Sequence, residues 1–322
     1  MASLLSVENL QVQFQTKKGI NTAVDGVSFS VEKGRILGIV GESGCGKSVT
    51  SMSILQLLGS NARISGGSIK LDGKELIGLP EKEMCRIRGN DIAMIFQDPM
   101  TALNPTLTIG TQLMEPIMLH QNCGKKEAWT SAVDVLKRVG IAAPEKRMKE
   151  YPHQLSGGMR QRVMIAMAVS CEPRLLIADE PTTALDVTIQ AQILELMCEL
   201  REKMGTAIML ITHDMGVVAE TADDVLVLYA GKAVEYGSIE DIFERPKHPY
   251  TQGLLNSIPR LDEDVELLNT IEGTVPAPDA MPAGCRFAPR CPYGKDRCMK
   301  EKPGVYHAGN SLVSCFRYEG EK

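Results

Sequence analysis

Apolar residues follow two different periods along the chain, and each period predicts a different kind of element. Unbroken apolar runs over residues 36–40 and 175–178 predict buried strands, and residues 1 to about 90 alternate short strands with glycine-containing turns. From residue 101 to residue 170, apolar positions instead recur every three or four residues, which predicts helices. The predicted helices span residues 109–120, 125–140 and 156–170. The pattern therefore favours an α/β fold with a strand-rich core and a helical block.

Composition and net charge limit the classes of protein to which this chain can belong. The chain has 322 residues, 43% of them hydrophobic, which allows a large core and about two domains. A formal net charge of -5 argues against general nucleic-acid binding. No apolar run approaches the roughly 20 residues that span a bilayer, and the N-terminus lacks a signal-peptide pattern. We therefore expect a soluble cytoplasmic chain that reaches a membrane only through a partner, with nine cysteines that form no disulfide framework.

Residues 41–48 carry a specific nucleotide-binding motif. They satisfy Gly-x-x-x-x-Gly-Lys-Ser, directly after the predicted strand 36–40 and before a helix predicted over residues 48–58. Glycines let backbone N–H groups turn inward, and a helix N-terminus favours an anion, so this phosphate loop is expected to hold a nucleotide. Lys47 is expected to reach the β- and γ-phosphates, and Ser48 to bind Mg²⁺. The expected nucleotide contacts are Gly41, Ser43, Gly44, Cys45, Gly46, Lys47, Ser48 and Val49.

Cys45 is a special position within the phosphate loop. It lies at the N-terminus of the predicted helix, where a thiolate is favoured. We therefore expect alkylation of Cys45 to block nucleotide binding, and bound Mg-ATP to protect the thiol. The alternative to a phosphate loop is a chance glycine turn before a helix, and the motifs that follow argue against it.

Two acids end the predicted strand at residues 175–178. Asp179 is expected near Mg²⁺ through a water, and Glu180 is expected to polarise an attacking water as a general base. An acidic pair in this place is more often a solvated strand end. A functional role for the two acids is favoured by the segment that directly follows them, residues 181–186, Pro-Thr-Thr-Ala-Leu-Asp.

Several segments, taken together, resemble the motifs of ABC (ATP-binding cassette) ATPases. Residues 155–159, Leu-Ser-Gly-Gly-Met, resemble the family signature except that Met159 stands where glutamine is commonest. Residues 181–186 resemble the D-loop, which communicates between two ATP sites. Residues 1 to about 240 therefore resemble one ABC nucleotide-binding domain with the P-loop NTPase fold, whose helical subdomain would span about 101–170.

The resemblance also implies roles for three isolated residues. Gln97, within Ile-Phe-Gln-Asp-Pro, resembles the Q-loop glutamine that approaches Mg²⁺ and the attacking water. His213 resembles the switch histidine that contacts the γ-phosphate, and Phe14 lies where the family places an aromatic ring against adenine. Without the resemblance they would be an exposed glutamine, a structural histidine and a core aromatic.

The signature implies that ATP is enclosed by two subunits. In the family, the signature of one cassette meets the γ-phosphate held by another, and this chain contains one cassette. The contacts implied are Ser156, Gly157 and Gly158 of the signature and Asp186 of the D-loop. Ser156 is also expected to cap the helix that follows, which is compatible with contacting an anion. The chain is therefore expected to form a head-to-tail dimer with itself or with a similar subunit.

The tail, residues 241–322, contains a second group of motifs. Residues 245–255 and 284–292 resemble the C-terminal extension of cassettes from dipeptide, oligopeptide and nickel importers. The tail also holds four cysteines whose spacing is wider than the Cys-x-x-Cys pairs of zinc ribbons: Cys285, Cys291, Cys298 and Cys315. Four thiolates suit Zn²⁺ or an iron–sulfur cluster, and the resemblance points to [4Fe–4S] in a structural or regulatory role. Zinc, free thiols and disulfides remain the alternatives.

The resemblance implies an ATPase subunit that powers import of dipeptides or oligopeptides. Its implied partners are a second ATPase subunit, two membrane permease subunits that would contact residues 98–116, and indirectly an extracytoplasmic solute-binding protein. It would then lie peripherally on the cytoplasmic side of the membrane, bound to ATP and Mg²⁺. The alternatives are an importer for nickel or another small solute, and a soluble ABC ATPase of iron–sulfur assembly without a permease. The importer-type tail argues against the assembly ATPase.

Overall fold

The computed structural model describes the whole chain except residues 1–2, 18, 99–101, 184–185, 259–269 and 321–322. The chain forms two compact units, each built from separated segments. Unit 1 comprises Met1–Val31, Ile36–Ile77 and Ile211–Lys322, and unit 2 comprises Glu32–Arg35 and Gly78–Leu210. The predicted boundary near residue 240 stays a prediction.

Unit 1 contains an antiparallel sheet from the N-terminal part of the chain. Its strand order is β2 (Gly19–Glu32), β1 (Ser3–Thr16), β4 (Ala62–Leu71) and β5 (Lys74–Glu75). β1 and β4 pair antiparallel, with Leu5 opposite Leu71 and Phe14 opposite Ala62. Alternate residues of β1 are buried, as expected when one face of a sheet packs on a core.

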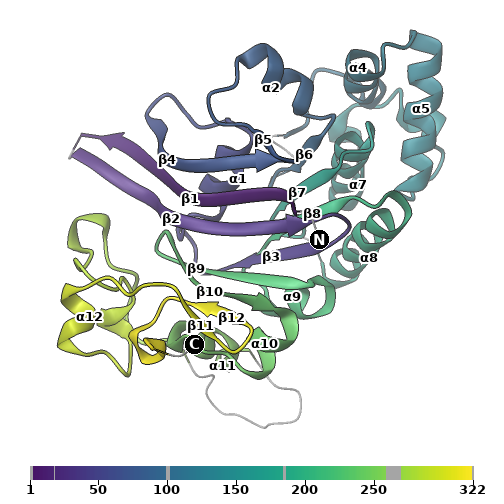
Figure 1. The fold of residues 1–322 in the computed structure, drawn as a ribbon. Helices are drawn as coiled ribbons and strands as arrows, with labels where there is room; N and C mark the ends of the chain where they lie inside the picture. Colours follow the sequence, from purple (N-terminus) through teal and green to yellow (C-terminus); the bar gives the residue numbers. More distant parts are fainter. Residues whose placement is uncertain (1–2, 18, 99–101, 184–185, 259–269, 321–322) are drawn as a thin grey trace. The chain divides into compact units, whose positions relative to one another are not determined.

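A second group of strands in unit 1 combines one strand from the N-terminal part of the chain with strands from its C-terminal part. β3 (Ile36–Val40) pairs parallel with β9 (Asp224–Tyr229), which pairs antiparallel with β10 (Lys232–Ser238). The tail adds β12 (Ser311–Val313) beside β10 and β11 (Tyr306–Ala308) beside β12, as the yellow strands of Figure 1 show. The tail therefore contributes strands to unit 1.

The helices of unit 1 are short and follow these strands. α1 (Lys47–Ile54) comes after β3, and α9 (Met215–Thr221) comes before β9. The remaining helices belong to the tail or lead into it: α10 (Ile239–Glu244), α11 (Pro249–Asn256), α12 (Asp296–Lys300) and the single turns Pro278–Ala280, Ala288–Arg290 and Phe316–Tyr318.

Unit 2 combines three strands with the helical block. β6 (Ile92–Ile95) pairs parallel with β7 (Leu175–Asp179), and β8 (Ala207–Ile211) lies on the other side of β7. The longer helices are α4 (Ile109–Gln121), α5 (Lys125–Arg138), α7 (Gly157–Val169) and α8 (Val187–Met204), with shorter turns at α2 (Glu81–Ile87), α6 (Pro144–Arg147) and Pro152–Gln154. α5 packs against α4 and α7 through an apolar stripe that includes Ala132 and Leu136.

The structure confirms the predicted α/β elements, with one correction. All five residues of β3 and of β7 are buried, which explains why these strands appear in the sequence as unbroken apolar runs. The three predicted helices are confirmed as α4, α5 and α7. The helix predicted over residues 48–58 is wrong at its end: α1 stops at Ile54, because Leu55 caps it and Gln56 turns the chain with a φ of 51°.

Candidate nucleotide-binding site

The phosphate loop connects β3 to α1 and depends on its glycines. Gly41 has a φ of 149°, and a Cβ atom at this position would collide with the carbonyl oxygen of Leu228. Gly46, with a φ of 100°, is the N-cap of α1, and among the described residues no side chain accepts a hydrogen bond there. The first N–H groups of α1 are therefore not capped by a side chain, as an anion-binding helix N-terminus requires.

Lys47 lies across the phosphate loop. Its side-chain nitrogen donates hydrogen bonds to the carbonyl oxygens of Gly41 and Glu42, at 2.7 and 3.2 Å. Thr50 steadies the start of α1 by donating from Oγ1 to the Gly46 carbonyl at 2.9 Å. Ser43, Gly44 and Ser48 are exposed, while Val49 is half-buried. The loop thus holds the Lys47 ammonium group in place, with exposed residues before and after Lys47 in the sequence.

The expectation of a thiolate at Cys45 is wrong. Cys45 is 2% exposed, and this burial raises the pKa of its thiol despite the neighbouring Lys47 ammonium. Desolvation of the charged form outweighs the attraction to the cation and to the helix N-terminus. Burial therefore argues against a thiolate at Cys45, while the effect of alkylation on nucleotide binding stays a prediction.

Within unit 2, the two predicted water-activating residues lie together. The Glu180 carboxylate follows the buried Asp179 at the end of β7 and accepts a hydrogen bond from the Gln97 side-chain amide at 2.9 Å. The Thr183 hydroxyl donates to the same carboxylate oxygen at 2.9 Å. Glu180 itself has a φ of 48°, which is uncommon for a non-glycine residue. Sequence reasoning missed Thr183, although it lies within the segment 181–186.

The signature residues line a cavity at the start of α7. Ser156 is the N-cap of this helix, and its hydroxyl accepts a hydrogen bond from the Met159 N–H at 3.4 Å, as predicted. Asp186 caps α8 in the same way, accepting from the Ile189 N–H at 2.9 Å. The cavity has a volume of about 490 Å³, and its lining includes Ser156, Gly157, Gly158, Asp186 and two arginines, Arg147 and Arg162. Ala184 and Leu185 of the D-loop lie outside the described residues.

The other two predicted nucleotide contacts belong to unit 1. His213 is exposed and lies between Thr212, whose N–H donates to the Ile39 carbonyl, and Asp214, which caps α9. Phe14 lies on β1 and is half-buried. The phosphate loop, His213 and Phe14 are thus in unit 1, whereas Gln97, Glu180 and the signature are in unit 2.

The four tail cysteines line one cavity. The cavity has a volume of about 80 Å³ and is lined by Cys285, Cys291, Cys298 and Cys315, together with His248 and Phe287. Burial raises the pKa of Cys285 to about 11 and also raises the pKa of Cys291 and Cys315. All nine cysteines of the chain are free. The donor set therefore suits a thiolate-bound group, yet among the described residues no three His, Cys, Asp or Glu side chains are arranged to hold a single metal ion.

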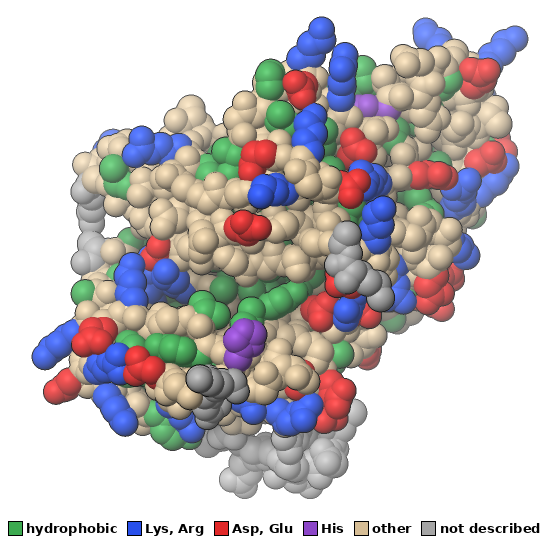
Figure 2. Space-filling view, viewed as in Figure 1, with side chains coloured by type: hydrophobic (Ala, Val, Ile, Leu, Met, Phe, Trp, Pro, Cys, Tyr) green, Lys and Arg blue, Asp and Glu red, His purple; other side chains and the backbone are tan. Residues whose placement is uncertain are grey.

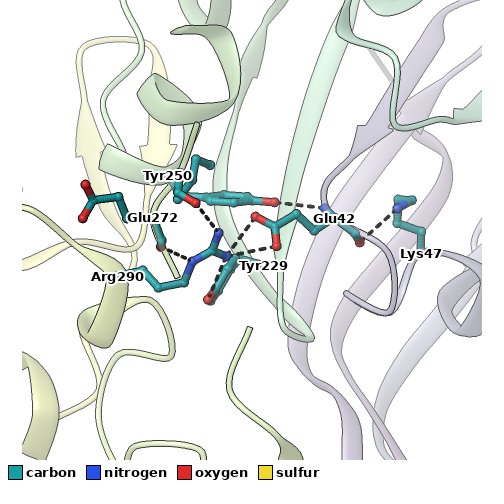
Figure 3. Close-up of polar contacts among 7 residues, drawn as sticks. Glu42, Lys47, Tyr229, Tyr250, Glu272 and Arg290 are labelled. Atoms are coloured by element: carbon teal, nitrogen blue, oxygen red, sulfur yellow. Dashed lines mark hydrogen bonds and ion pairs between the residues drawn. The ribbon is translucent and has the colours of Figure 1, made fainter. Parts of the chain in front are cut away.

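The tail also contacts the phosphate loop, which sequence reasoning missed (Figure 3). The Tyr250 hydroxyl accepts a hydrogen bond from the Glu42 N–H at 2.9 Å. The Arg290 guanidinium donates to both carboxylate oxygens of Glu42, at 2.9 and 3.0 Å. Both residues lie in the segments 245–255 and 284–292, where the only sequence signal was their resemblance to an importer tail.

The surface and helices add two observations. On the face drawn in Figure 2, Lys and Arg side chains are interspersed with Asp and Glu. In the described part of the chain, no helix combines the length and the apolar character needed to cross a membrane.

Two family models match the chain. Residues 24–183 match the model of the ABC transporter family. Residues 234–298 match the model of the oligopeptide/dipeptide transporter C-terminal region. The second match includes α10, α11 and three of the four tail cysteines, and it ends before β11 and β12.

The chain is similar to bacterial transport proteins over nearly its whole length. It is 56% identical to the oligopeptide transport ATP-binding protein AppD of Bacillus subtilis, covering 100% of this chain and 98% of that protein. It is 54% identical to the dipeptide transport ATP-binding protein DppD of Bacillus subtilis, covering 98% and 95%. It is 52% identical to the oligopeptide transport ATP-binding protein OppD of Escherichia coli, covering 98% and 93%.

Solved structures of ABC cassettes have the same fold. A dimeric, post-hydrolysis structure of the ATP-binding cassette MJ0796, bound to ADP and phosphate, has a TM-score of 0.66 and 27% identity, covering 73% of this chain and 98% of that one. The structure of cbiO1 from Clostridium perfringens, part of the ABC transporter complex cbiONQ, has a TM-score of 0.65 and 28% identity, covering 76% and 92%.

Proposed function

Because the chain belongs to the ABC transporter family, we propose that it is the ATP-hydrolysing subunit of an importer for oligopeptides or dipeptides. The observation that carries this proposal is the similarity over the full length to transport ATP-binding proteins, including the match of residues 234–298 to the oligopeptide/dipeptide transporter C-terminal region. The names of these relatives favour peptides over nickel, and the tail match favours a transporter over a soluble ATPase of iron–sulfur assembly.

We propose separate roles for these residues in ATP hydrolysis. The phosphate loop and Lys47 would hold the phosphates, with Phe14 against adenine, and Ser48, Asp179 and Gln97 would be the residues that serve Mg²⁺. When bound, Mg²⁺ neutralises charge on the phosphate oxygens. The contacts that Gln97 and Thr183 make with Glu180 support its role as the base, because they fix the carboxylate that must accept a proton from water. His213 contacts the γ-phosphate.

The signature supports action as a dimer. Ser156, Gly157 and Gly158 lie at the N-terminus of α7, where an anion is favoured, and they share a cavity with Asp186. We propose that this cavity receives the γ-phosphate held by a second, identical or similar ATPase subunit. The relative MJ0796 is itself dimeric.

The remaining partners follow from the family. We propose that two permease subunits contact the segment 98–116, of which residues 99–101 lie outside the described residues. An extracytoplasmic solute-binding protein would deliver the peptide to the permease. The chain would then be peripheral on the cytoplasmic side of the cell membrane.

A transport assay tests the proposed function. The tagged chain is purified from native membranes, its partners are identified, and ATP hydrolysis is measured with peptide-loaded binding protein in liposomes. We expect two permeases to copurify and peptide to stimulate hydrolysis. Stimulation by nickel but not by peptides would favour the first alternative, and recovery without any membrane protein would favour the second.

We also propose that Cys285, Cys291, Cys298 and Cys315 hold a [4Fe–4S] cluster that stabilises the tail. The support is that the four thiols line one cavity. A bound cluster would link residues that are separated along a segment with little apolar content. Zinc is the alternative group.

Metal analysis of the full-length chain tests this second proposal. After anaerobic purification we expect about four irons and four sulfides per chain, as the cluster formula requires. Cys298→Ser should lower the iron content, whereas Cys85→Ser, at an exposed cysteine outside the cavity, should not. Stoichiometric zinc without iron would contradict the cluster.

A further inference from the structure

Glu42 places a carboxylate inside the loop that is built to hold phosphates. It directly follows Gly41, and its own carbonyl oxygen accepts a hydrogen bond from Lys47. A carboxylate and a nucleotide phosphate repel each other, and this repulsion is poorly screened in a partly buried site. The Glu42 side chain is 29% exposed. A loop with this residue therefore needs a way to remove the carboxylate from the phosphates.

Arg290 from the tail meets this carboxylate. Its guanidinium donates to both Glu42 oxygens through Nη1, and its side chain is only 6% exposed. Figure 3 shows the Glu42 side chain pointing toward Arg290, with Lys47 on the opposite side of Glu42. Charge-assisted hydrogen bonds of this kind are among the stronger contacts of a protein.

Arg290 is itself fixed by four further contacts. Its Nε donates to the Glu272 carbonyl at 3.0 Å, and its Nη2 donates to the Ile271 carbonyl at 3.2 Å. Its Nη1 also donates to the Tyr229 hydroxyl at 3.4 Å, and the guanidinium lies 5.7 Å from the centre of the same ring. A guanidinium held at each of its nitrogens is pre-organised for the Glu42 contact.

The tail also fixes the backbone of the phosphate loop at Glu42. The Tyr250 hydroxyl accepts the Glu42 N–H at 2.9 Å. The Tyr250 ring is fully buried and lies 4.7 Å from the Tyr229 ring and 5.4 Å from the Phe287 ring, measured between centroids. Side chain and backbone of Glu42 are thus both held by residues of unit 1 outside the loop.

We propose that Arg290 is a positioning residue for ATP binding, which neutralises the Glu42 carboxylate and holds it on the side away from Lys47. Arg290 contacts Glu42 and would act on the phosphates through it. The proposal rests on the proposed function, because it assumes that the phosphate loop binds ATP. In this proposal, the tail contributes to nucleotide binding within the same chain.

A double-mutant cycle tests the proposal with the full-length chain. The Kd for a fluorescent ATP analogue with Mg²⁺, and kcat and KM for ATP, are measured for Arg290→Gln, Glu42→Gln and the double variant. We expect Arg290→Gln to raise Kd and KM about tenfold with a smaller change in kcat, because an unpaired carboxylate then faces the phosphates. The double variant should regain most of the lost affinity. Arg290→Lys, which keeps the charge but loses the planar fork, should lie between.

The outcomes separate this proposal from the proposed function. If Arg290→Gln binds ATP as the native chain does, or if the double variant binds as weakly as Arg290→Gln, the proposal is overturned. Should Arg290→Gln not fold, Arg290→Lys and the double variant still decide. Lysine keeps the charge but loses the guanidinium contacts that position Glu42, so Arg290→Lys should bind ATP more weakly than the native chain, and the double variant, which lacks the carboxylate, should bind more tightly than Arg290→Lys. Lys47→Ala serves as the reference: ATP binding unchanged in that variant would instead overturn the phosphate loop as the ATP site.

Discussion

At the end of β7, the Glu180 carboxylate accepts hydrogen bonds from Gln97 and Thr183. Replacement of the carboxylate by an amide removes the proton acceptor while leaving the phosphate loop intact. We therefore expect Glu180→Gln to keep ATP affinity near native and to lower kcat by at least about 100-fold, the scale of general-base catalysis. Single-turnover kinetics and equilibrium binding check this.

The control for that variant is Glu195→Gln, at an exposed position of α8. It makes the same chemical change outside the site and should turn over ATP at the native rate. Undiminished turnover in Glu180→Gln would remove Glu180 from the proposed role.

Thr183 provides a residue-scale prediction that came only from the structure. Its hydroxyl donates to Glu180 at 2.9 Å, so Thr183→Val removes a hydrogen bond to a charged group while keeping the shape of the side chain. We expect kcat to fall about tenfold with little change in KM, the usual scale for such a bond. Steady-state kinetics measure it. Thr183→Ser, which keeps the hydroxyl, should recover most of the rate, and equal loss in both variants would argue against the hydrogen bond.

At the scale of elements, the N-terminus of α7 combines a structural role with a functional one. The Ser156 hydroxyl caps the helix, and Asp is as good a cap as Ser. Ser156→Asp should therefore keep the free energy of unfolding within about 0.5 kcal/mol of native while placing a negative charge where the partner's γ-phosphate is proposed to bind. We expect ATP hydrolysis to fall at least about tenfold. Denaturant unfolding and ATPase assays measure the two effects.

The control variant for the Ser156→Asp prediction is Ser156→Ala. It removes the cap without adding charge, so it should lower the free energy of unfolding by about 1 kcal/mol. If Ser156→Asp retains native hydrolysis, the signature does not meet a phosphate.

Element boundaries show how far local sequence controls structure. β3 and β7 agree with their apolar runs because both faces of these parallel strands are buried. α1 ends earlier than its sequence predicts, since Gln56 adopts a left-handed conformation and donates its N–H to the Ser53 carbonyl. Periodicity specifies the interior of a helix, whereas its end depends on where the chain must turn.

At the scale of the whole molecule, the proposed composite site predicts ATP-dependent association. Glu180→Gln retains ATP, so with Mg-ATP it should form a dimer if two identical chains are sufficient. Lys47→Ala should stay monomeric because it loses the phosphate contact. Light scattering after size-exclusion chromatography measures the mass. A Lys47→Ala variant that dimerises equally well with ATP would contradict the link between binding and association.

The same experiment identifies the kind of partner. A Glu180→Gln chain that remains monomeric with Mg-ATP, but forms a dimer when a second ATPase subunit from its own membrane complex is added, would indicate a heterodimer.

The local features of this protein could be predicted from its sequence. The phosphate loop, the buried strands, the three long helices of the helical block and the Ser156 cap are short-range patterns, because they depend on glycine conformations, periodic burial and neighbouring N–H groups. The resemblance of residues 241–322 to an importer tail was also visible in the sequence, and the match of residues 234–298 agrees with it.

The contacts between residues that are distant in the chain became visible in the folded structure. It buried Cys45 and so raised its thiol pKa, it placed Thr183 and Gln97 against Glu180, and it brought four cysteines around one cavity. It also joined Arg290 to Glu42, which are 248 positions apart in the chain. Such contacts depend on desolvation and on the packing of separate elements, so no local pattern of residues encodes them.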